Sequence, residues 1–133
     1  MAAKINNDGI EIGIVVRDAE KSLAFYRDVL GLDYLGDLTF PGNHMWRFQA
    51  GKSVIKLLEQ TPTPEAANPV DDASGFRYLS LFVSNIDELV ADVEAAGCTI
   101  AIPVTEFQPG ARFAFVQDPE GNRIELLDVD MSR

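Results

Sequence analysis

The sequence predicts an α+β fold in which one strand-helix-strand-strand-strand module occurs twice. Two stretches carry this prediction, EIGIVVRDAEKSLAFYRDVLGL from Glu11 and YLSLFVSNIDELVADVEAAGC from Tyr78. Each combines an apolar strand, a capping residue, an amphipathic helix and a glycine stop, and three strand-like runs follow it. The two stretches keep a constant offset of 67 residues from their first strand to the helix cap, at Asp18 and Asn85.

The first module is expected over residues 9–60 and begins with a strand at residues 10–16. Asp18 is placed to cap the following helix, and Gly31 is placed to stop it. The apolar stripe of this helix consists of Leu23, Tyr26, Val29 and Leu30. Three further strands are expected at residues 34–38, 44–49 and 53–59.

Residues 61–75 are expected to link the modules, because TPTPEAANPVDDASG is rich in Pro, Ala and Asp and has no periodicity. The second module, residues 76–129, opens with a strand at 77–83. Asn85 and Glu88 have the spacing of a capping box, and Gly97 ends the helix. The remaining expected elements are strands at 99–102, 112–117 and 122–128, with a type I turn at DPEG, residues 118–121.

Length and composition indicate a single soluble domain, residues 1–133, with 47% hydrophobic residues. No apolar run is long enough for a membrane span, and the N-terminus has no signal-peptide core. Cys98 is the single cysteine, which fits a reducing, cytoplasmic location. The net charge of −10 disfavours nucleic acid and anionic lipid as partners and would suit a cationic ligand.

Strand alternation selects candidate catalytic residues. In SVIKLLE, Lys56 lies on the face opposite Ile55 and Leu57, and in NRIELLD, Glu125 lies on the face opposite its apolar neighbours. If the apolar faces pack under the helices, Lys56 and Glu125 point into a cavity. Glu11 and Tyr78 occupy matching positions at the start of the two first strands, which makes all four residues candidates.

The segments SLAFYRDVLGL, residues 22–32, and DPEGNRIELLD, residues 118–128, resemble the vicinal oxygen chelate superfamily, which includes glyoxalase, bleomycin-resistance and extradiol dioxygenase proteins. The resemblance implies a glyoxalase-like fold, in which two βαβββ modules form a cupped mixed β-sheet with the helices on its outer face. It also implies a homodimer and a small-molecule ligand. In metal-dependent members, the four candidate positions commonly hold His, Glu, His and Glu. Here they hold Glu11, Lys56, Tyr78 and Glu125.

This set disfavours a metal cofactor. An ammonium group cannot ligate a metal unless it is deprotonated, and a divalent ion about 4 Å away would be repelled by about 8 kcal/mol at an effective dielectric near 20. Lys56 between Glu11 and Glu125 is therefore expected to replace the ion. Two other interpretations stay open: a relic salt-bridge cluster, and a metal held by Glu11, Tyr78 and Glu125 with His44.

Candidate ligand-binding residues come from the neighbouring strands. His44 and Trp46 alternate on one face of HMWRFQ, and the repeat matches them with Phe113 and Phe115. These four residues are expected to line the concave face.

Two functions follow from these expectations. The first is a metal-independent isomerase, epimerase or lyase that acts on a small oxygenated substrate. Glu11 or Glu125 would be the general base, Lys56 would stabilise an enolate, and Tyr78 or His44 would relay a proton. The alternative is a non-catalytic protein that sequesters a ligand or drug, as bleomycin-resistance proteins do.

Overall fold

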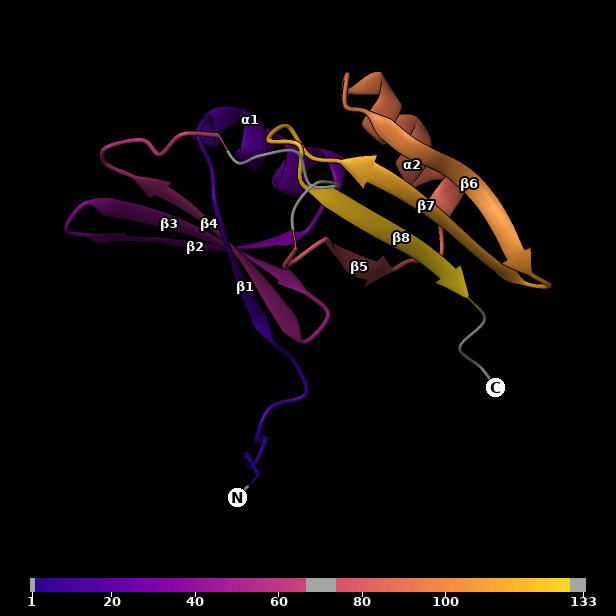
Figure 1. Ribbon diagram of the computed structural model, residues 1–133, viewed down its shortest axis with the longest axis horizontal. Helices are drawn as coiled ribbons and strands as arrows, with labels where there is room; N and C mark the ends of the chain where they lie inside the picture. The colour runs from indigo at the N-terminus through magenta and orange to yellow at the C-terminus, as the bar shows by residue number, and fades with distance from the viewer. Residues whose placement is uncertain (1, 67–73, 130–133) are drawn as a thin grey trace. The chain divides into compact units, whose positions relative to one another are not determined.

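The computed structural model describes residues 2–66 and 74–129 and divides into two compact units (Figure 1). Unit 1 comprises Met1–Pro64 and unit 2 comprises Glu65–Arg133. The division falls within the predicted linker, of which residues 67–73 lie outside the described residues.

Unit 1 contains one mixed, four-stranded sheet with the order β1-β4-β3-β2. Strands β1 and β4 are parallel, whereas the β4–β3 and β3–β2 pairs are antiparallel. Its elements are β1 (Glu11–Val15), α1 (Ala19–Leu23), the π-helix η1 (Ala24–Val29), β2 (Asp33–Phe40), β3 (Asn43–Ala50) and β4 (Ser53–Gln60).

Unit 2 repeats this topology with the order β5-β8-β7-β6 and a parallel β5–β8 pair. Its elements are β5 (Tyr78–Phe82), α2 (Ile86–Ala95), β6 (Ile100–Gln108), β7 (Ala111–Gln117) and β8 (Arg123–Val129). The predicted α+β fold of two βαβββ modules is therefore confirmed, and each module builds a four-stranded sheet of its own.

The registers of the two parallel pairs also agree. Gly13 is the partner of Lys56 on β4, and Ser80 is the partner of Glu125 on β8. The predicted equivalence of Lys56 with Glu125 therefore holds at the level of strand pairing.

One face of each sheet is covered by the helices of its own unit and forms the core. In unit 1, the ring centroids of Tyr26 and Phe48 lie 6.4 Å apart, and both residues are fully buried. Ile55 and Leu57 are buried beside them. In unit 2, Ile86 and Val93 of α2 are buried, as are Ala114, Val116, Ile124 and Leu126 of the sheet. Full burial of each large apolar side chain stabilises the fold by about 1.5–3 kcal/mol.

The first helix begins and ends where the sequence predicts, but its second half is a π-helix. The Asp18 side chain accepts a hydrogen bond from Lys21 N at 3.2 Å, and Gly31 takes a φ of 69° at the stop. In between, Leu30 N donates to Phe25 O, five residues earlier, at 2.9 Å. The neighbouring residues Phe25 and Tyr26 are both buried in this wider turn.

Two local predictions are wrong. Asn85 makes no side-chain cap to α2, because its amide nitrogen contacts Glu88 Oε2 at 3.4 Å instead, so the capping box does not form. Strand β6 extends well past residue 102 and includes Pro103. Because β6 is an edge strand, the missing N–H of proline costs it less pairing than it would cost a central strand.

The DPEG turn forms as predicted and is organised by Asp118, whose exposed fraction is only 4%. Gly121 N donates to Asp118 O at 3.0 Å, which closes the turn. Asp118 Oδ1 accepts from Glu120 N at 2.9 Å and from Asn122 N at 2.8 Å, while Oδ2 accepts from the Asn122 amide at 3.0 Å. One carboxylate thus satisfies several donors at the entrance to β8.

Asp118→Ala is expected to lower the free energy of unfolding by about 2 kcal/mol, because it leaves half-buried backbone donors without an acceptor. Urea denaturation followed by circular dichroism measures the change. Asp92→Ala, the same truncation on an exposed part of α2, is the control and should change stability by less than about 0.5 kcal/mol. Equal effects of the two substitutions would contradict the role assigned to Asp118.

Candidate functional sites on the open sheet faces

The sheet face opposite the helices, called here the open face, carries the predicted catalytic residues of unit 1. Lys56 lies on β4 between the buried Ile55 and Leu57 and therefore points to the open face. Its Nζ lies 3.5 Å from Glu11 Oε1, and the two side chains are 28% and 58% exposed, respectively. The predicted pairing of Lys56 with Glu11 is therefore present.

Two residues beside Lys56 were absent from the sequence prediction. Arg47 of β3 is its direct antiparallel partner and shares the open face. Gly13 is its partner on β1 and places no side chain beside it. The pairing of β3 with β4 follows from the tight turn at Gly51–Lys52, since Ala50 pairs with Ser53. That turn was the signal in the sequence from which Arg47 could have been found.

The open face of unit 2 holds Glu125 in a different setting. Ser80 Oγ of β5 donates a hydrogen bond to Glu125 Oε1 at 2.8 Å. Phe115 is the antiparallel partner of Glu125. The Phe115 ring contacts the Tyr78 ring edge-on, with the two ring centroids 4.9 Å apart. Glu125 is half-buried, so this hydrogen bond holds a carboxylate in a defined position beside an apolar surface. The sequence prediction did not include Ser80.

Four aromatic rings follow one another across the open face of unit 2, and we call them the aromatic row. The ring centroids of Phe115 and Phe113 are 6.0 Å apart, and those of Phe113 and Phe107 are 5.7 Å apart. The row consists of Tyr78, Phe115, Phe113 and Phe107. Tyr78 and Phe107 are about half exposed, at 49% and 51%. The placement expected for Phe113 and Phe115, on the same face as Glu125, therefore agrees with the structure.

His44 and Trp46 do not share the face of Lys56, so their predicted placement is wrong. Trp46 pairs with the buried Leu57 and lies on the helix side of the sheet. His44 lies on the same side, where its ring stacks on the Trp46 ring with the centroids 4.1 Å apart. The His44 Nε2 atom contacts Asp37 Oδ2 at 2.6 Å.

The error has a simple cause. The prediction assumed that β3 and β7 are separated by the same number of residues as Lys56 of β4 and Glu125 of β8. However, the turn before β4 is shorter than the turn before β8, which shifts the match by one residue. In strand pairing, Arg47 corresponds to Phe115, because their partners are Lys56 and Glu125.

The donor groups fit a divalent metal poorly. Within neither unit do three or more His, Cys, Asp or Glu side chains of the described residues come together in a way that could hold an ion. At the first-module position, Glu11 is in contact with the Lys56 ammonium. Lysine offers no lone pair while it is charged, so this contact competes with metal binding.

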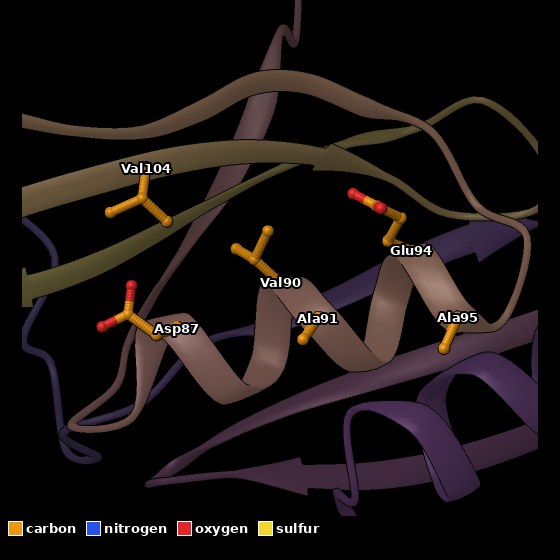
Figure 2. Close-up of a pocket in the computed structure, with 6 residues that line it drawn as sticks. All are labelled: Asp87, Val90, Ala91, Glu94, Ala95 and Val104. Atoms are coloured by element: carbon orange, nitrogen blue, oxygen red, sulfur yellow. The ribbon is translucent and has the colours of Figure 1, made fainter.

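A surface hollow of about 460 Å³ lies elsewhere in unit 2, between α2 and β6 (Figure 2). It is lined by Asp87, Val90, Ala91, Glu94, Ala95 and Val104. None of the predicted site residues borders it. Its lining contains no cation that could stabilise a developing negative charge, so the open faces remain the better candidates for chemistry.

Cys98 is half-buried beyond the end of α2. Burial raises the pKa of its thiol, and the negative charge of Asp118 raises it further. A raised pKa lowers the fraction of reactive thiolate at neutral pH, which agrees with an inert cysteine.

Among the described residues, no helix is long and apolar enough to span a membrane.

Comparisons with known proteins agree with this architecture. Residues 10–126 match the model of the Glyoxalase/Bleomycin resistance protein/Dioxygenase superfamily. The chain is 29% identical over 120 residues to the Escherichia coli protein YaeR, with 88% of this chain and 92% of that protein covered. It is 27% identical over 127 residues to a probable lactoylglutathione lyase of Synechocystis, with 90% and 94% covered.

A solved structure supports the fold independently. The crystal structure of a glyoxalase family protein from Bacillus cereus superposes with a TM-score of 0.81 and 20% identity. The match covers 95% of each chain.

Proposed function

The chain belongs to the Glyoxalase/Bleomycin resistance protein/Dioxygenase superfamily, and we propose that it catalyses a proton transfer on a small oxygenated molecule without a metal. The predicted family resemblance is thereby confirmed. The reaction class would be an isomerisation, an epimerisation or a lyase step. The similarity to a probable lactoylglutathione lyase supports an α-hydroxycarbonyl or thioester substrate.

The observation that carries the proposal is the different surroundings of Glu125 and Glu11. Glu125 is half-buried and held by Ser80 at 2.8 Å, whereas the Glu11 side chain is 58% exposed and paired with Lys56. A positioned, partly desolvated carboxylate is the better general base. Glu125 is therefore assigned as the base that removes a proton next to a carbonyl group.

Lys56 is assigned as the cation that stabilises a developing negative charge on the oxygen of a substrate at the open face of unit 1. An ammonium at this position supplies the positive charge that a Lewis acid would supply, and preorganised charge of this kind is a large term in enzymatic catalysis. Tyr78, whose ring centroid lies 4.9 Å from that of Phe115, is assigned as a substrate contact that donates a hydrogen bond through its hydroxyl group.

Glu125→Gln is expected to lower turnover by about 10²-fold or more, because the amide cannot accept the proton. Lys56→Gln is expected to cost about 10²-fold through the lost charge. The measurement is ¹H NMR of α-proton exchange into D₂O with chelator present, using S-lactoylglutathione and a panel of α-hydroxyketones. Glu94→Gln, on exposed α2, is the matched control and should retain full activity.

Full turnover in Glu125→Gln would overturn the assignment of the base.

A second function, ligand sequestration, is favoured by the aromatic row. Successive rings on the open face, of which Tyr78 and Phe107 are about half exposed, suit the stacking of a planar or cationic molecule, and the net charge of −10 suits a cation. Saturable binding of bleomycin that persists in Glu125→Gln, with no exchange in any substrate, would select this function over the enzyme.

A further prediction concerns metal content. Protein purified without chelator should hold no stoichiometric divalent ion, whereas Lys56→Glu should bind more Zn²⁺, Ni²⁺ or Mn²⁺ than the parent, because the repelling charge becomes a ligand. Elemental analysis after dialysis measures both. Lys52→Glu carries the same change at an exposed position and is the control. Near-stoichiometric metal in the parent, lost with activity on chelation, would contradict the proposal.

We also propose a homodimer, since members of this superfamily with similar sheets commonly pair and two-fold dimers are the commonest assemblies. Light scattering at micromolar concentration should give about twice the chain mass of 14.6 kDa. A mass that stays at one chain over the whole concentration range would rule this out.

A further inference from the structure

Two cations lie side by side on the open face of unit 1. Arg47 and Lys56 are direct partners in the antiparallel β3–β4 pair, so their side chains project from neighbouring points on one face. Like charges in such a pair destabilise a sheet unless a counter-charge is present. The pair therefore needs an anion nearby.

The unit provides only part of that counter-charge. Glu11 contacts Lys56 at 3.5 Å, but its side chain is 58% exposed, and exposed ion pairs of this kind are weak and readily exchanged. Among the described residues, no carboxylate lies within 4.0 Å of the Arg47 guanidinium. Arg47 Nη2 donates to Leu35 O at 3.3 Å, while Arg47 Nε is buried and has no acceptor in the described part of the chain.

The β1 position next to this pair carries no side chain. Gly13 is the β1 partner of Lys56, and Leu58 packs against it, since a Cβ on Gly13 would lie only 3.3 Å from Leu58 Cδ1. In unit 2 the corresponding position holds Ser80, whose hydroxyl group is bonded to Glu125. The two units thus differ here in the sign of the charge and in whether a polar side chain lies beside it.

We propose that Arg47 and Lys56 form a binding site for an anionic oxygen group, a carboxylate or a phosphate, on a small molecule. The guanidinium group would bind two oxygens through its fork of N–H donors, and the ammonium would provide a second charge from the neighbouring strand. Glu11 would release Lys56 when the anion binds. The proposal deepens the proposed function, on which it rests for calling the ligand a substrate, by making that substrate an anion.

The test is a titration of the ¹⁵N-labelled protein with oxalate, inorganic phosphate and the neutral amide oxamide, at constant ionic strength set with sodium chloride. The Arg47 Nε–Hε signal and the amides of β3 and β4 should shift saturably with oxalate or phosphate, and not with oxamide. The stronger of the two anions identifies the group as a carboxylate or a phosphate.

Arg47→Gln and, separately, Lys56→Gln should each weaken binding at least tenfold. Two variants are used so that a folding defect in one of them leaves the other informative, and circular dichroism checks the folding of both. Arg27→Gln removes an exposed guanidinium that pairs with Asp28 at 2.9 Å, and it should leave the affinity unchanged. Shifts that never saturate, or equal affinity in the parent and both variants, would overturn the proposal.

The readout needs no turnover, so the two proposals can fail separately. Anion binding without any proton exchange would leave this inference standing and remove the enzyme. Proton exchange that depends on Glu125 but proceeds on neutral substrates, with no saturable shift caused by an anion, would keep the enzyme and remove the anion site.

Discussion

The strict alternation of side chains along the paired strands is the constraint on which the rest of the structure depends. On β4, Ile55 and Leu57 are buried under the helices, and this burial turns Lys56 to the open face. On β8, Ile124 and Leu126 do the same for Glu125. A shift of one residue in either strand would bury the ionisable group and expose the core, so hydrophobic packing fixes the direction of both candidate site residues.

The sequence was sufficient for the fold because the signals are local and repeated. Alternation, helix caps and glycine stops predicted the elements, and Pro119 and Gly121 predicted the turn between β7 and β8. It failed where a neighbouring strand decided the outcome. His44 and Trp46 were placed on the wrong face because turn length, rather than the repeat, sets the register of β3 against β4. The end of β6 was missed because tolerance of Pro103 depends on the strand lying at an edge.

The candidate site was predictable only in part for the same reason. Lys56 and Glu125 could be predicted because each interrupts an apolar alternation within its own strand. Arg47 and Ser80 become visible only through cross-strand pairing, and neither belongs to an apolar pattern of its own. Partners on neighbouring strands, which change the polarity around a site, are therefore less evident from the sequence than site residues that belong to an alternating pattern within one strand.

The matched registers of the two parallel pairs separate the surface chemistry of each module from its packing. Gly13 and Lys56 in one module, and Ser80 and Glu125 in the other, occupy corresponding ladder positions above separate cores. A substitution at Lys56, Ser80 or Glu125 changes the surface chemistry of one module and leaves the packing beneath it intact. Each module can therefore carry a different surface polarity on the same architecture. The same independence would let a protein engineer graft the polar set of one half onto the other.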